Sequence, residues 1–303
     1  MSNLDGQRVS ASARLRAVMS RIYDLHSHST ASDGDLSPFE LVQRAHAQQV
    51  DVLALTDHDV TDGLSEAAEM AASLGMGFVP GIEVSVSWQR QTVHIVGLHI
   101  DPDSVELQAG LARLREFRNW RAEEIGRRLE KDGISGAYEG ATQLARGAII
   151  SRTHFAQFLV VNGYAKDMRD VFKRFLIKNK PGYVSGEWAS LEEAVGWITR
   201  SGGQAVIAHP ARYKMTATRL RRLIRDFREL GGSGFEVVSG THSADEIKYM
   251  GRLANQFELL ASCGSDFHSP NNVYLELGRL ASLPEACTPV WSDARWQDTG
   301  LPQ

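Results

Sequence analysis

The chain has 303 residues, with 33 Lys and Arg against 37 Asp and Glu and a formal net charge of −4. Its length and its 43% of hydrophobic residues supply a full hydrophobic core and exclude an intrinsically disordered chain. The acidic balance excludes a protein that holds long nucleic acid through its overall field. Any anionic ligand therefore needs local positive charge.

Cysteine usage and hydropathy indicate the compartment. Cys263 and Cys287 are the only cysteines, too few for a disulfide framework or a thiolate zinc site, so we expect a reduced, cytoplasmic protein. No apolar run approaches the roughly 18–20 residues of a membrane span, so no membrane partner is expected. Residues 1–20 lack the apolar core of a secretory signal and are expected to be a partly disordered N-terminal extension.

From residue 21 onward, short runs rich in Val, Ile and Leu alternate with segments of helical period, a pattern typical of an α/β fold with a largely parallel sheet. Strands are predicted over residues 21–28, 52–59, 78–85, 93–100, 204–209, 235–239 and 259–265. Helices are predicted over residues 38–49, 63–74, 191–201, 216–230 and 244–256. This number of strands favours an irregular (β/α) barrel over a small open sheet.

The alternation stops between residues 102 and 185, where the sequence predicts no strand. Leu107, Leu111, Leu114, Ile125 and Leu129 follow helical spacing in a segment rich in Arg and Glu, which predicts an amphipathic helix. Further helices are predicted over residues 155–161 and 168–177. We interpret residues 102–185 as a helical insertion that covers the active-site end of a barrel formed by residues 21–101 and 186–290, with a C-terminal tail over 291–303.

Imidazoles and carboxylates recur on the predicted strands. Asp24, His26 and His28 share one face of the first strand, because strand side chains alternate with a period of two, so the two histidines can clamp one ion. Other candidates follow at or near strand ends, where ligands gather in parallel α/β folds. They are Asp33, His58, Glu83, His209, Asp266 and His268, together with His94, which lies near the start of its predicted strand.

Taken singly, each of these residues could be a helix cap, a turn former or a buried hydrogen-bonding group. Taken together, they would crowd unpaired polar groups at a substantial cost unless cations compensate them. Nitrogen and oxygen donors without thiolates favour Mn²⁺, Fe²⁺ or Zn²⁺ over a structural cysteine-bound zinc ion.

Five motifs carry a resemblance to the polymerase-and-histidinol-phosphatase (PHP) family over residues 21–101 and 186–268. They are Asp24-Leu-His26-Ser-His28, Thr56-Asp57-His58-Asp59, Gly81-Ile-Glu83, His209-Pro210 and Gly264-Ser-Asp266-Phe-His268. The resemblance implies a distorted (β/α)₇ barrel with two or three divalent ions, of which Mn²⁺ is favoured and Fe²⁺ and Zn²⁺ are alternatives.

The resemblance also implies the ligands of each ion. His26, His28, Glu83 and Asp266 would hold the first, and Glu83 would bridge to a second that is also held by His94 and His209. Asp33, His58 and His268 would hold a third. A water bridging ions roughly 3.5–4 Å apart would become a hydroxide that attacks phosphorus in line, so no protein nucleophile is required. Asp24, Asp57 and Asp59 are candidates for orienting the imidazoles.

A closer resemblance is to PHP members that act on nucleotides, the 3′,5′-nucleoside bisphosphate phosphatases and related enzymes that trim short RNA from its 5′ end. It is carried by residues 150–155, 180–184 and 238–243. It implies that Arg152 and His154 meet the substrate. Further candidates for a second phosphate are Lys180, Arg212 and His242, and His242 and His154 are the candidate catalytic acids. Each could instead be a solvated or capping residue.

The predicted function is therefore hydrolysis of the 3′-phosphate of nucleoside 3′,5′-bisphosphates, such as adenosine 3′,5′-bisphosphate, with 5′-to-3′ trimming of short RNA as a second activity. Expected partners are a small nucleotide and short RNA, and no long duplex DNA. Tyr183, Trp188 and Tyr213 could stack a base, with core packing as the alternative. The alternatives in function are a histidinol-phosphate-type phosphatase, a C–N amidohydrolase and a non-catalytic PHP module that interacts with a polymerase. The full ligand set favours an enzyme.

Overall fold

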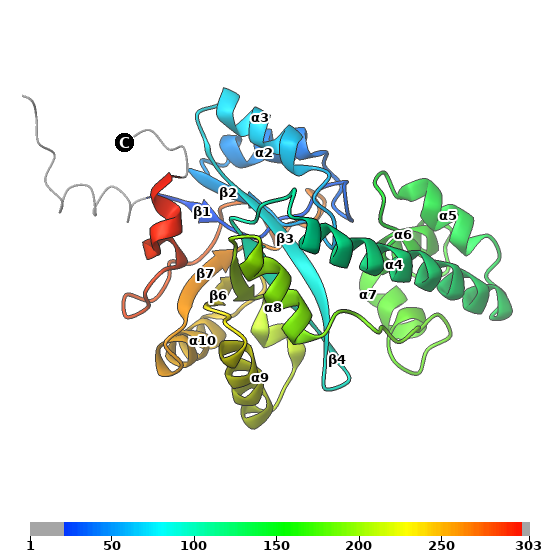
Figure 1. Ribbon diagram of the computed structural model, residues 1–303. Coiled ribbons are helices and arrows are strands. Elements are labelled where there is room, and N and C mark those ends of the chain that lie inside the picture. Colours follow the sequence, from blue (N-terminus) through cyan, green and yellow to red (C-terminus); the bar gives the residue numbers. More distant parts are fainter. Residues whose placement is uncertain (1–20, 299–303) are drawn as a thin grey trace, which may run out of the picture.

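The computed structural model describes residues 21–298, so the N-terminal extension expected over residues 1–20 lies outside the described residues, as do residues 299–303. Seven strands form one sheet in chain order (Figure 1). They are β1 (Tyr23–Asp24), β2 (Val52–Leu55), β3 (Gly77–Trp88), β4 (Gln91–Leu98), β5 (Gln204–Ile207), β6 (Gly234–Ser239) and β7 (Leu260–Gly264). The N–H of Leu25 donates to the carbonyl of Cys263 over 3.0 Å, which joins the first strand to the last. The predicted distorted seven-stranded barrel is confirmed.

Strand β4 departs from the parallel pattern that the sequence predicts. It pairs antiparallel with both β3 and β5, whereas the other neighbouring strands are parallel. A two-residue turn joins β3 to β4, and its residues Gln89 and Arg90 have φ values of 46° and 62°, as hairpin turns require. Because β4 is reversed, its beginning lies where the parallel strands end.

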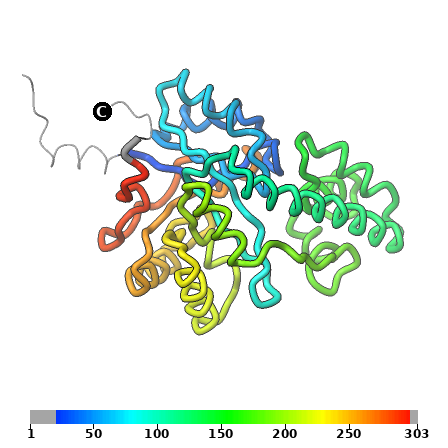
Figure 2. The backbone as a smooth tube through the Cα atoms, viewed as in Figure 1, coloured from blue at the N-terminus to red at the C-terminus, as the bar shows by residue number. Residues whose placement is uncertain are grey.

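Helices cover the outside of the barrel (Figure 2). They are α2 (Pro38–Ala47), α3 (Leu64–Ser73), α8 (Leu191–Arg200), α9 (Ala217–Glu229) and α10 (Ala244–Gln256). Ser37 caps α2 in a capping box with Glu40, and Pro38 occupies the first turn. On α9 the buried residues are Leu220, Leu223, Ile224 and Phe227, so its arginines form the solvated face.

The segment between β4 and α8 is helical and extends to one side of the barrel (Figure 1). It contains α4 (Val105–Lys131), α5 (Ala137–Leu144), α6 (Arg152–Val161), α7 (Met168–Val171) and a π-helical turn (Phe172–Leu176). These helices enclose a hydrophobic cluster of their own, separate from the barrel core. Helix α5 was not predicted from the sequence.

Helix α4 runs alongside α8 in the opposite direction. Glu106, near its start, pairs with Arg200, the last residue of α8, and Arg113 pairs with Glu193 near the start of α8 over 2.8 Å. Helix α8 leads back to the beginning of β5, so α4 starts at the level where the parallel strands begin and rises toward the end where they finish. Its second half packs into the insertion.

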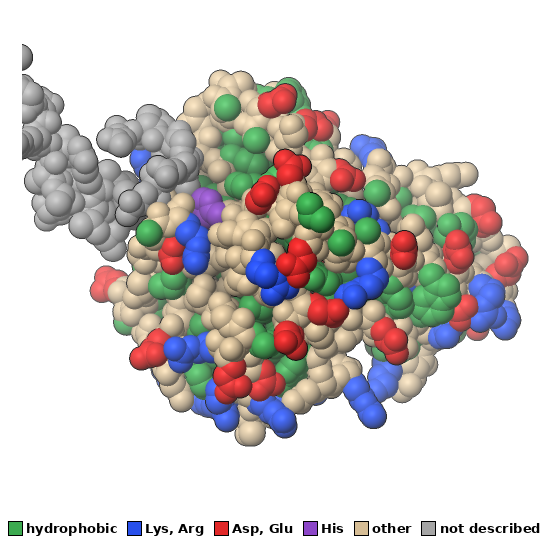
Figure 3. Space-filling model, viewed as in Figure 1, with side chains coloured by type: hydrophobic (Ala, Val, Ile, Leu, Met, Phe, Trp, Pro, Cys, Tyr) green, Lys and Arg blue, Asp and Glu red, His purple; other side chains and the backbone are tan. Residues whose placement is uncertain are grey.

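The described part of the predicted C-terminal tail packs on the barrel. The ring of Trp291 stacks on Tyr23 with the ring centroids 4.0 Å apart, and Trp296 is buried. Among residues 21–298, no helix combines the length and the apolarity of a membrane span. On the face shown in Figure 3, acidic and basic side chains are interspersed over the surface.

Candidate metal centre

One cavity of about 230 Å³ opens at the end of the barrel where the parallel strands finish. All of the predicted metal-binding side chains are brought together there. Seven of them line the cavity: Asp33, His58, Glu83, His94, His209, Asp266 and His268. The other two, His26 and His28, are fully buried and contact the same carboxylates.

Glu83 lies at the centre of this cluster. Its Oε1 is 2.9 Å from Nδ1 of His94 and 3.0 Å from Nε2 of His209. Its Oε2 is 3.3 Å from Nε2 of His26, 3.2 Å from Nε2 of His28 and 2.9 Å from Nδ1 of His58. The reversal of β4 explains how His94 reaches this position, because His94 pairs with Ser85 at the site end of β3.

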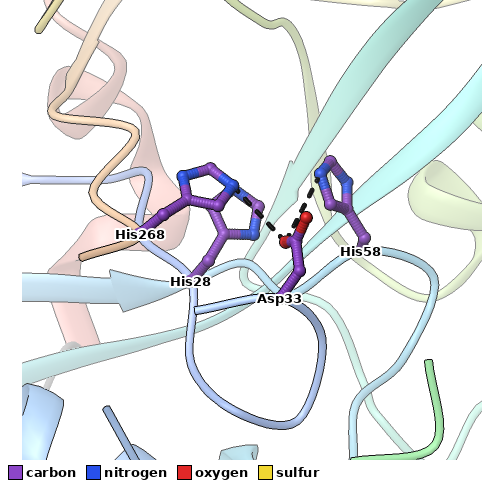
Figure 4. A group of neighbouring side chains, drawn as sticks. All are labelled: His28, Asp33, His58 and His268. Carbon is purple, nitrogen blue, oxygen red and sulfur yellow. Dashed lines mark ion pairs between the residues drawn. The ribbon is translucent and has the colours of Figure 1, made fainter. Parts of the chain in front are cut away.

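A second group surrounds Asp33, which Figure 4 shows between His268 and His58. Oδ1 of Asp33 is 3.4 Å from Nε2 of His268 and 3.9 Å from Nε2 of His58. The ring of His28 stacks on that of His268, with the centroids 4.1 Å apart. His28 therefore stands between the carboxylates of Glu83 and Asp266 on one side and the group around Asp33 on the other.

Buried atoms without hydrogen-bond partners test whether ions fit. Asp33 Oδ1, His58 Nδ1 and Glu83 Oε2 are buried, and each lacks a hydrogen-bond partner among the described residues although imidazoles or carboxylates lie close by. Buried polar atoms are normally satisfied. Three groups of side chains place their donor atoms within 4.8 Å of one another: His26, His28, Glu83 and Asp266; His28, Asp33, His58 and His268; and His58, Glu83 and His94. The residues present fit divalent ions.

The charges in the cluster are strongly coupled. Burial opposes ionisation of Glu83, yet the neighbouring His94, His58 and His26 hold the pKa of its carboxyl well below the usual range. Burial likewise opposes ionisation of Asp33, whose pKa is held low by His268 and His58. Both carboxylates are therefore anionic, which is the form that binds a cation.

Three residues of the site hold a left-handed backbone that side chains other than glycine rarely adopt. The φ values are 56° at Asp59, 28° at His209 and 56° at Asp266, and each residue lies two to four positions beyond the end of a strand. Such conformations cost on the order of 1–3 kcal/mol each and concentrate at functional sites. The N–H of Asp266 donates to the carbonyl of His26 over 2.8 Å, and the N–H of His209 donates to the carboxylate of Glu236, which holds two of them in place.

Glu236 is a site residue that sequence reasoning missed. It is buried on β6 beside a β-bulge, a feature that redirects side chains. Its Oε1 accepts from Nδ1 of His26 over 3.0 Å. The only sequence signal was an acidic residue inside an otherwise apolar strand.

The sequence made Asp24, Asp57 and Asp59 candidates for orienting the imidazoles, and the hydrogen bonds of all three run to the loops, to β3 and to α4. Asp24 accepts from the N–H groups of Ser265 and Gly278, and Asp57 accepts from Ser29 and Ser32. Asp59 accepts from the N–H of Ser85 and from Arg118. These carboxylates fix the backbone that carries the cluster.

The predicted substrate residues separate into two sets. Arg152 and Arg212 line the cavity, and Arg212 pairs with Asp266. Tyr183 and Trp188 also line it, whereas the hydroxyl of Tyr213 donates to the carbonyl of Ala208.

Lys180, His154 and His242 do not line the cavity. Lys180 is exposed. His154 is buried and closes a capping box, in which its Nδ1 accepts from the N–H of Ser151 over 3.1 Å. Nδ1 of His242 lies 3.1 Å from the carbonyl oxygen of Val237. The structure thus gives His154 a role in starting α6.

Comparison with known proteins identifies the family. The model of the PHP domain matches residues 24–184, more than half of the chain. The chain belongs to the PHP family. The 3′,5′-nucleoside bisphosphate phosphatase of Chromobacterium violaceum is 52% identical over 271 residues, which cover 89% of this chain and 95% of that PHP protein. The 5′-3′ exoribonuclease Rnm of Escherichia coli is 46% identical, with 89% of this chain and 92% of that protein covered.

A solved structure shares the fold of this chain over most of its length. An amidohydrolase from Chromobacterium violaceum, crystallised with bound sulfate and no metal, superposes with a TM-score of 0.87 at 52% identity. The match covers 89% of this chain and 95% of that one.

Proposed function

We propose that this PHP protein is a metal-dependent phosphoesterase that releases the 3′-phosphate of nucleoside 3′,5′-bisphosphates, such as adenosine 3′,5′-bisphosphate, to give the 5′-monophosphate and phosphate. A second proposed activity is 5′-to-3′ trimming of short RNA. The observation that carries the proposal is a cluster of imidazoles and carboxylates that shares one cavity with arginine side chains. The names of the two curated relatives support both substrates.

The proposed ligands fall into three sets around the carboxylates. His26, His28, Glu83 and Asp266 form the first, Glu83, His94 and His209 the second, and Asp33, His58 and His268 the third. When bound, divalent ions supply an activated water and neutralise charge on the phosphoryl oxygens. Mn²⁺ is the proposed ion, with Fe²⁺ or Zn²⁺ as alternatives, because the donors are nitrogen and oxygen without thiolate.

The protein side chains bind and orient the substrate. Arg212 and Arg152 line the cavity and present planar donor groups that match phosphate oxygens. Tyr183 and Trp188 line the same cavity and offer apolar surface for the ribose and base. The proposal assigns no catalytic role to His154 or His242, whose rings do not line the cavity.

The direct test is phosphate release by the metal-loaded protein from adenosine 3′,5′-bisphosphate, with AMP identified as the second product. Histidinol phosphate tests the alternative phosphatase function. A short 5′-phosphorylated oligoribonucleotide tests the second proposed activity, the trimming of RNA. We expect rapid release of phosphate from the bisphosphate and stepwise release of nucleotides from the RNA. Release from histidinol phosphate alone would replace the proposal by the alternative phosphatase.

The proposed setting is the cytoplasm, with a small nucleotide or short RNA as partner. Cys263 and Cys287 are both free, which suits a reducing compartment. Long duplex DNA is not a proposed partner, because the chain has a formal net charge of −4 and acidic side chains are interspersed with basic ones on the face that Figure 3 shows.

A further inference from the structure

Strands β4 and β5 stop pairing regularly where they reach the metal centre. Their antiparallel pairing runs to Ile95 and Ile207, so His94 and Ala208 form the next pair. Because the N–H of Ala208 donates to the carbonyl of His94 over 3.1 Å, a regular ladder would have the N–H of His94 donate back to Ala208. It donates instead to the hydroxyl of Tyr213 over 2.9 Å. A tyrosine side chain thus takes the place of the last hydrogen bond of the ladder.

The hydroxyl of Tyr213 bridges the two strands. It accepts from the N–H of His94 and donates to the carbonyl of Ala208 over 2.7 Å, whereas the carbonyl of His94 is farther away at 3.3 Å. A hydroxyl can accept and donate at once because it carries one hydrogen and two lone pairs. The oxygen atom therefore keeps the two strands farther apart at this point than a direct hydrogen bond between them would.

Two further contacts fix the position of this hydroxyl. Tyr213 ends the short 3₁₀ helix Pro210–Tyr213, which begins directly after His209, and its ring packs edge-on against the ring of His209 with the centroids 5.4 Å apart. The backbone carbonyl of Tyr213 accepts from Nε2 of Gln91, the first residue of β4, over 2.7 Å. Tyr213 is thus tied to both strands by its backbone as well as by its side chain.

The bridge lies next to two of the proposed metal ligands. His94 and His209 are the imidazoles assigned to the second ion, and their rings are T-shaped with the centroids 5.3 Å apart. Each places a ring nitrogen within 3.0 Å of Oε1 of Glu83. The hydroxyl of Tyr213 bonds to the backbone of the first ligand and to that of the residue immediately before the second. The spacing of the two backbones therefore decides where the two imidazoles meet.

Tyr213 acts on the ligands and not on the substrate. It does not line the cavity, so it is not placed to stack on a base. Core packing, the alternative that the sequence allows, requires only the ring and would leave the hydroxyl dispensable. The two hydrogen bonds of the hydroxyl between the strands give it a role that packing does not explain.

We propose that Tyr213 is a positioning residue whose hydroxyl sets the separation of His94 and His209, and with it the affinity for the second ion. This inference rests on the ligand sets of the proposed function. Without the hydroxyl, the N–H of His94 bonds directly to Ala208 as in a regular ladder, which draws the two ligands together. Within residues 21–298, the hydrogen bonds of Tyr213 reach no residue of the first or third ligand set, so those sets keep their spacing.

Tyr213→Phe tests the proposal, because it removes the hydroxyl and keeps the ring against His209. We expect calorimetric titration of the metal-free protein with Mn²⁺ to show one ion bound about 10- to 100-fold more weakly than in the wild type, with the other ions unchanged. Electron paramagnetic resonance should show weaker coupling between neighbouring Mn²⁺ ions at a concentration that saturates the wild type. Tyr249→Phe is the matched control, because its buried hydroxyl has no hydrogen-bond partner among the described residues, and it should bind Mn²⁺ as the wild type does.

Turnover gives a second measurement. The Mn²⁺ concentration for half-maximal release of phosphate from adenosine 3′,5′-bisphosphate should rise by the same factor in Tyr213→Phe, while the KM at saturating Mn²⁺ stays close to that of the wild type. Gln91→Leu removes the bond to the carbonyl of Tyr213 but keeps the hydroxyl, so it should shift the Mn²⁺ dependence in the same direction by less. A general loss of stability would lower the Tm without selecting one ion.

The outcomes separate the two claims. Binding of every ion as in the wild type by Tyr213→Phe, or an equal loss of affinity for all ions, would overturn the positioning role while the phosphatase chemistry stands. Absence of phosphate release from any phosphate ester by the metal-loaded wild type would overturn the proposed function. The Mn²⁺ titration would then still decide the role of Tyr213, since selective weakening of one ion supports it and unchanged binding refutes it.

Discussion

Nδ1 of His26 donates to Oε1 of Glu236 over 3.0 Å, and the other carboxylate oxygen of Glu236 accepts from the backbone N–H of His209. One buried carboxylate thus fixes two of the residues that surround Glu83. It sets the tautomer of His26, leaving Nε2 free to face the cluster. Partners of this kind raise the basicity of a metal-bound imidazole and hold its orientation.

Glu236→Gln should lower metal affinity and kcat by about 10- to 100-fold, because the neutral amide binds the His26 N–H more weakly. Competition with a chelating dye and turnover of adenosine 3′,5′-bisphosphate measure the two effects. Glu258→Gln is the control, since that side chain is 79% exposed and pairs with Arg228 on the surface. An unchanged metal affinity in Glu236→Gln would show that Glu236 does not position the site.

The double variant His26→Ala with Asp266→Ala removes two of the proposed ligands of the first ion. We expect activity to fall by more than about 100-fold, beyond the effect of losing an outer partner, with most of the barrel retained. Turnover of adenosine 3′,5′-bisphosphate measures the loss of activity, and far-ultraviolet circular dichroism checks that the barrel is retained. Metal analysis should show fewer bound ions per chain than in the wild-type protein. Survival of activity with both residues gone would mean that the metal assignment is wrong.

Thr153 connects the insertion to the site, since its hydroxyl donates to Oδ2 of Asp33 over 2.9 Å. Thr153→Val keeps the shape and removes this bond, so we expect kcat/KM to fall by about tenfold as Asp33 loses its orientation. Thr153→Ser should restore most of the activity. Thr142→Val, whose hydroxyl bonds only within α5, should have no effect. Equal rates for Thr153→Val and wild type would contradict the connection.

The buried pair of Arg118 and Asp59 predicts a stability effect. Asp59→Asn tolerates the left-handed backbone at this position but leaves Arg118 buried without its partner, so the free energy of unfolding should fall by about 3–5 kcal/mol. Urea denaturation measures this loss. The double variant with Arg118→Met should recover much of it, because the unpaired charge is then gone. If the losses in the free energy of unfolding caused by the two single substitutions simply added in the double variant, Asp59 and Arg118 would not be coupled.

The alternation of strands and helices was sufficient to predict the barrel, and the placing of histidines and carboxylates at strand ends predicted that they would meet at one end of it, as they do. The assignment of ligands to individual ions came from the family resemblance and stays a prediction. The sequence was not sufficient for the direction of β4, since a reversed strand and a parallel one have the same hydrophobic pattern. For that reason His94 seemed to lie at the wrong end of its strand. The turn at Gln89 and Arg90, without glycine, gave no clear hairpin signal.

The residues that sequence reasoning missed owe their roles to contacts between distant segments. Arg118 and Arg121 lie on a helix crowded with charged residues, where nothing local distinguishes a buried arginine from a solvated one. Glu236 acquires its partner His26 from a segment 210 residues away. Conversely, the motif around Arg152 and His154 suggested two substrate contacts, but the ring of His154 turns back to cap its own helix.

Because β4 is reversed, the length of α4 sets how far Arg118 lies from the beginning of the parallel strands. The chain leaves β4 far from the catalytic opening, and α4 carries it back, so that Arg118 stands about 18 Å along the helix axis from Glu106. Glu106 is fixed by its ion pair with Arg200. The number of residues from Glu106 to Arg118 and Arg121 therefore determines how far along the helix axis these arginines lie and in which direction around the axis they project. Deleting one residue from that stretch would turn Arg118 and Arg121 by about 100° around the helix, whereas adding seven would keep their heading and lift them by about 10 Å. Length variation in this stretch among PHP proteins should therefore change both the cavity wall beside the metal centre and the pairing of Arg118 with Asp59.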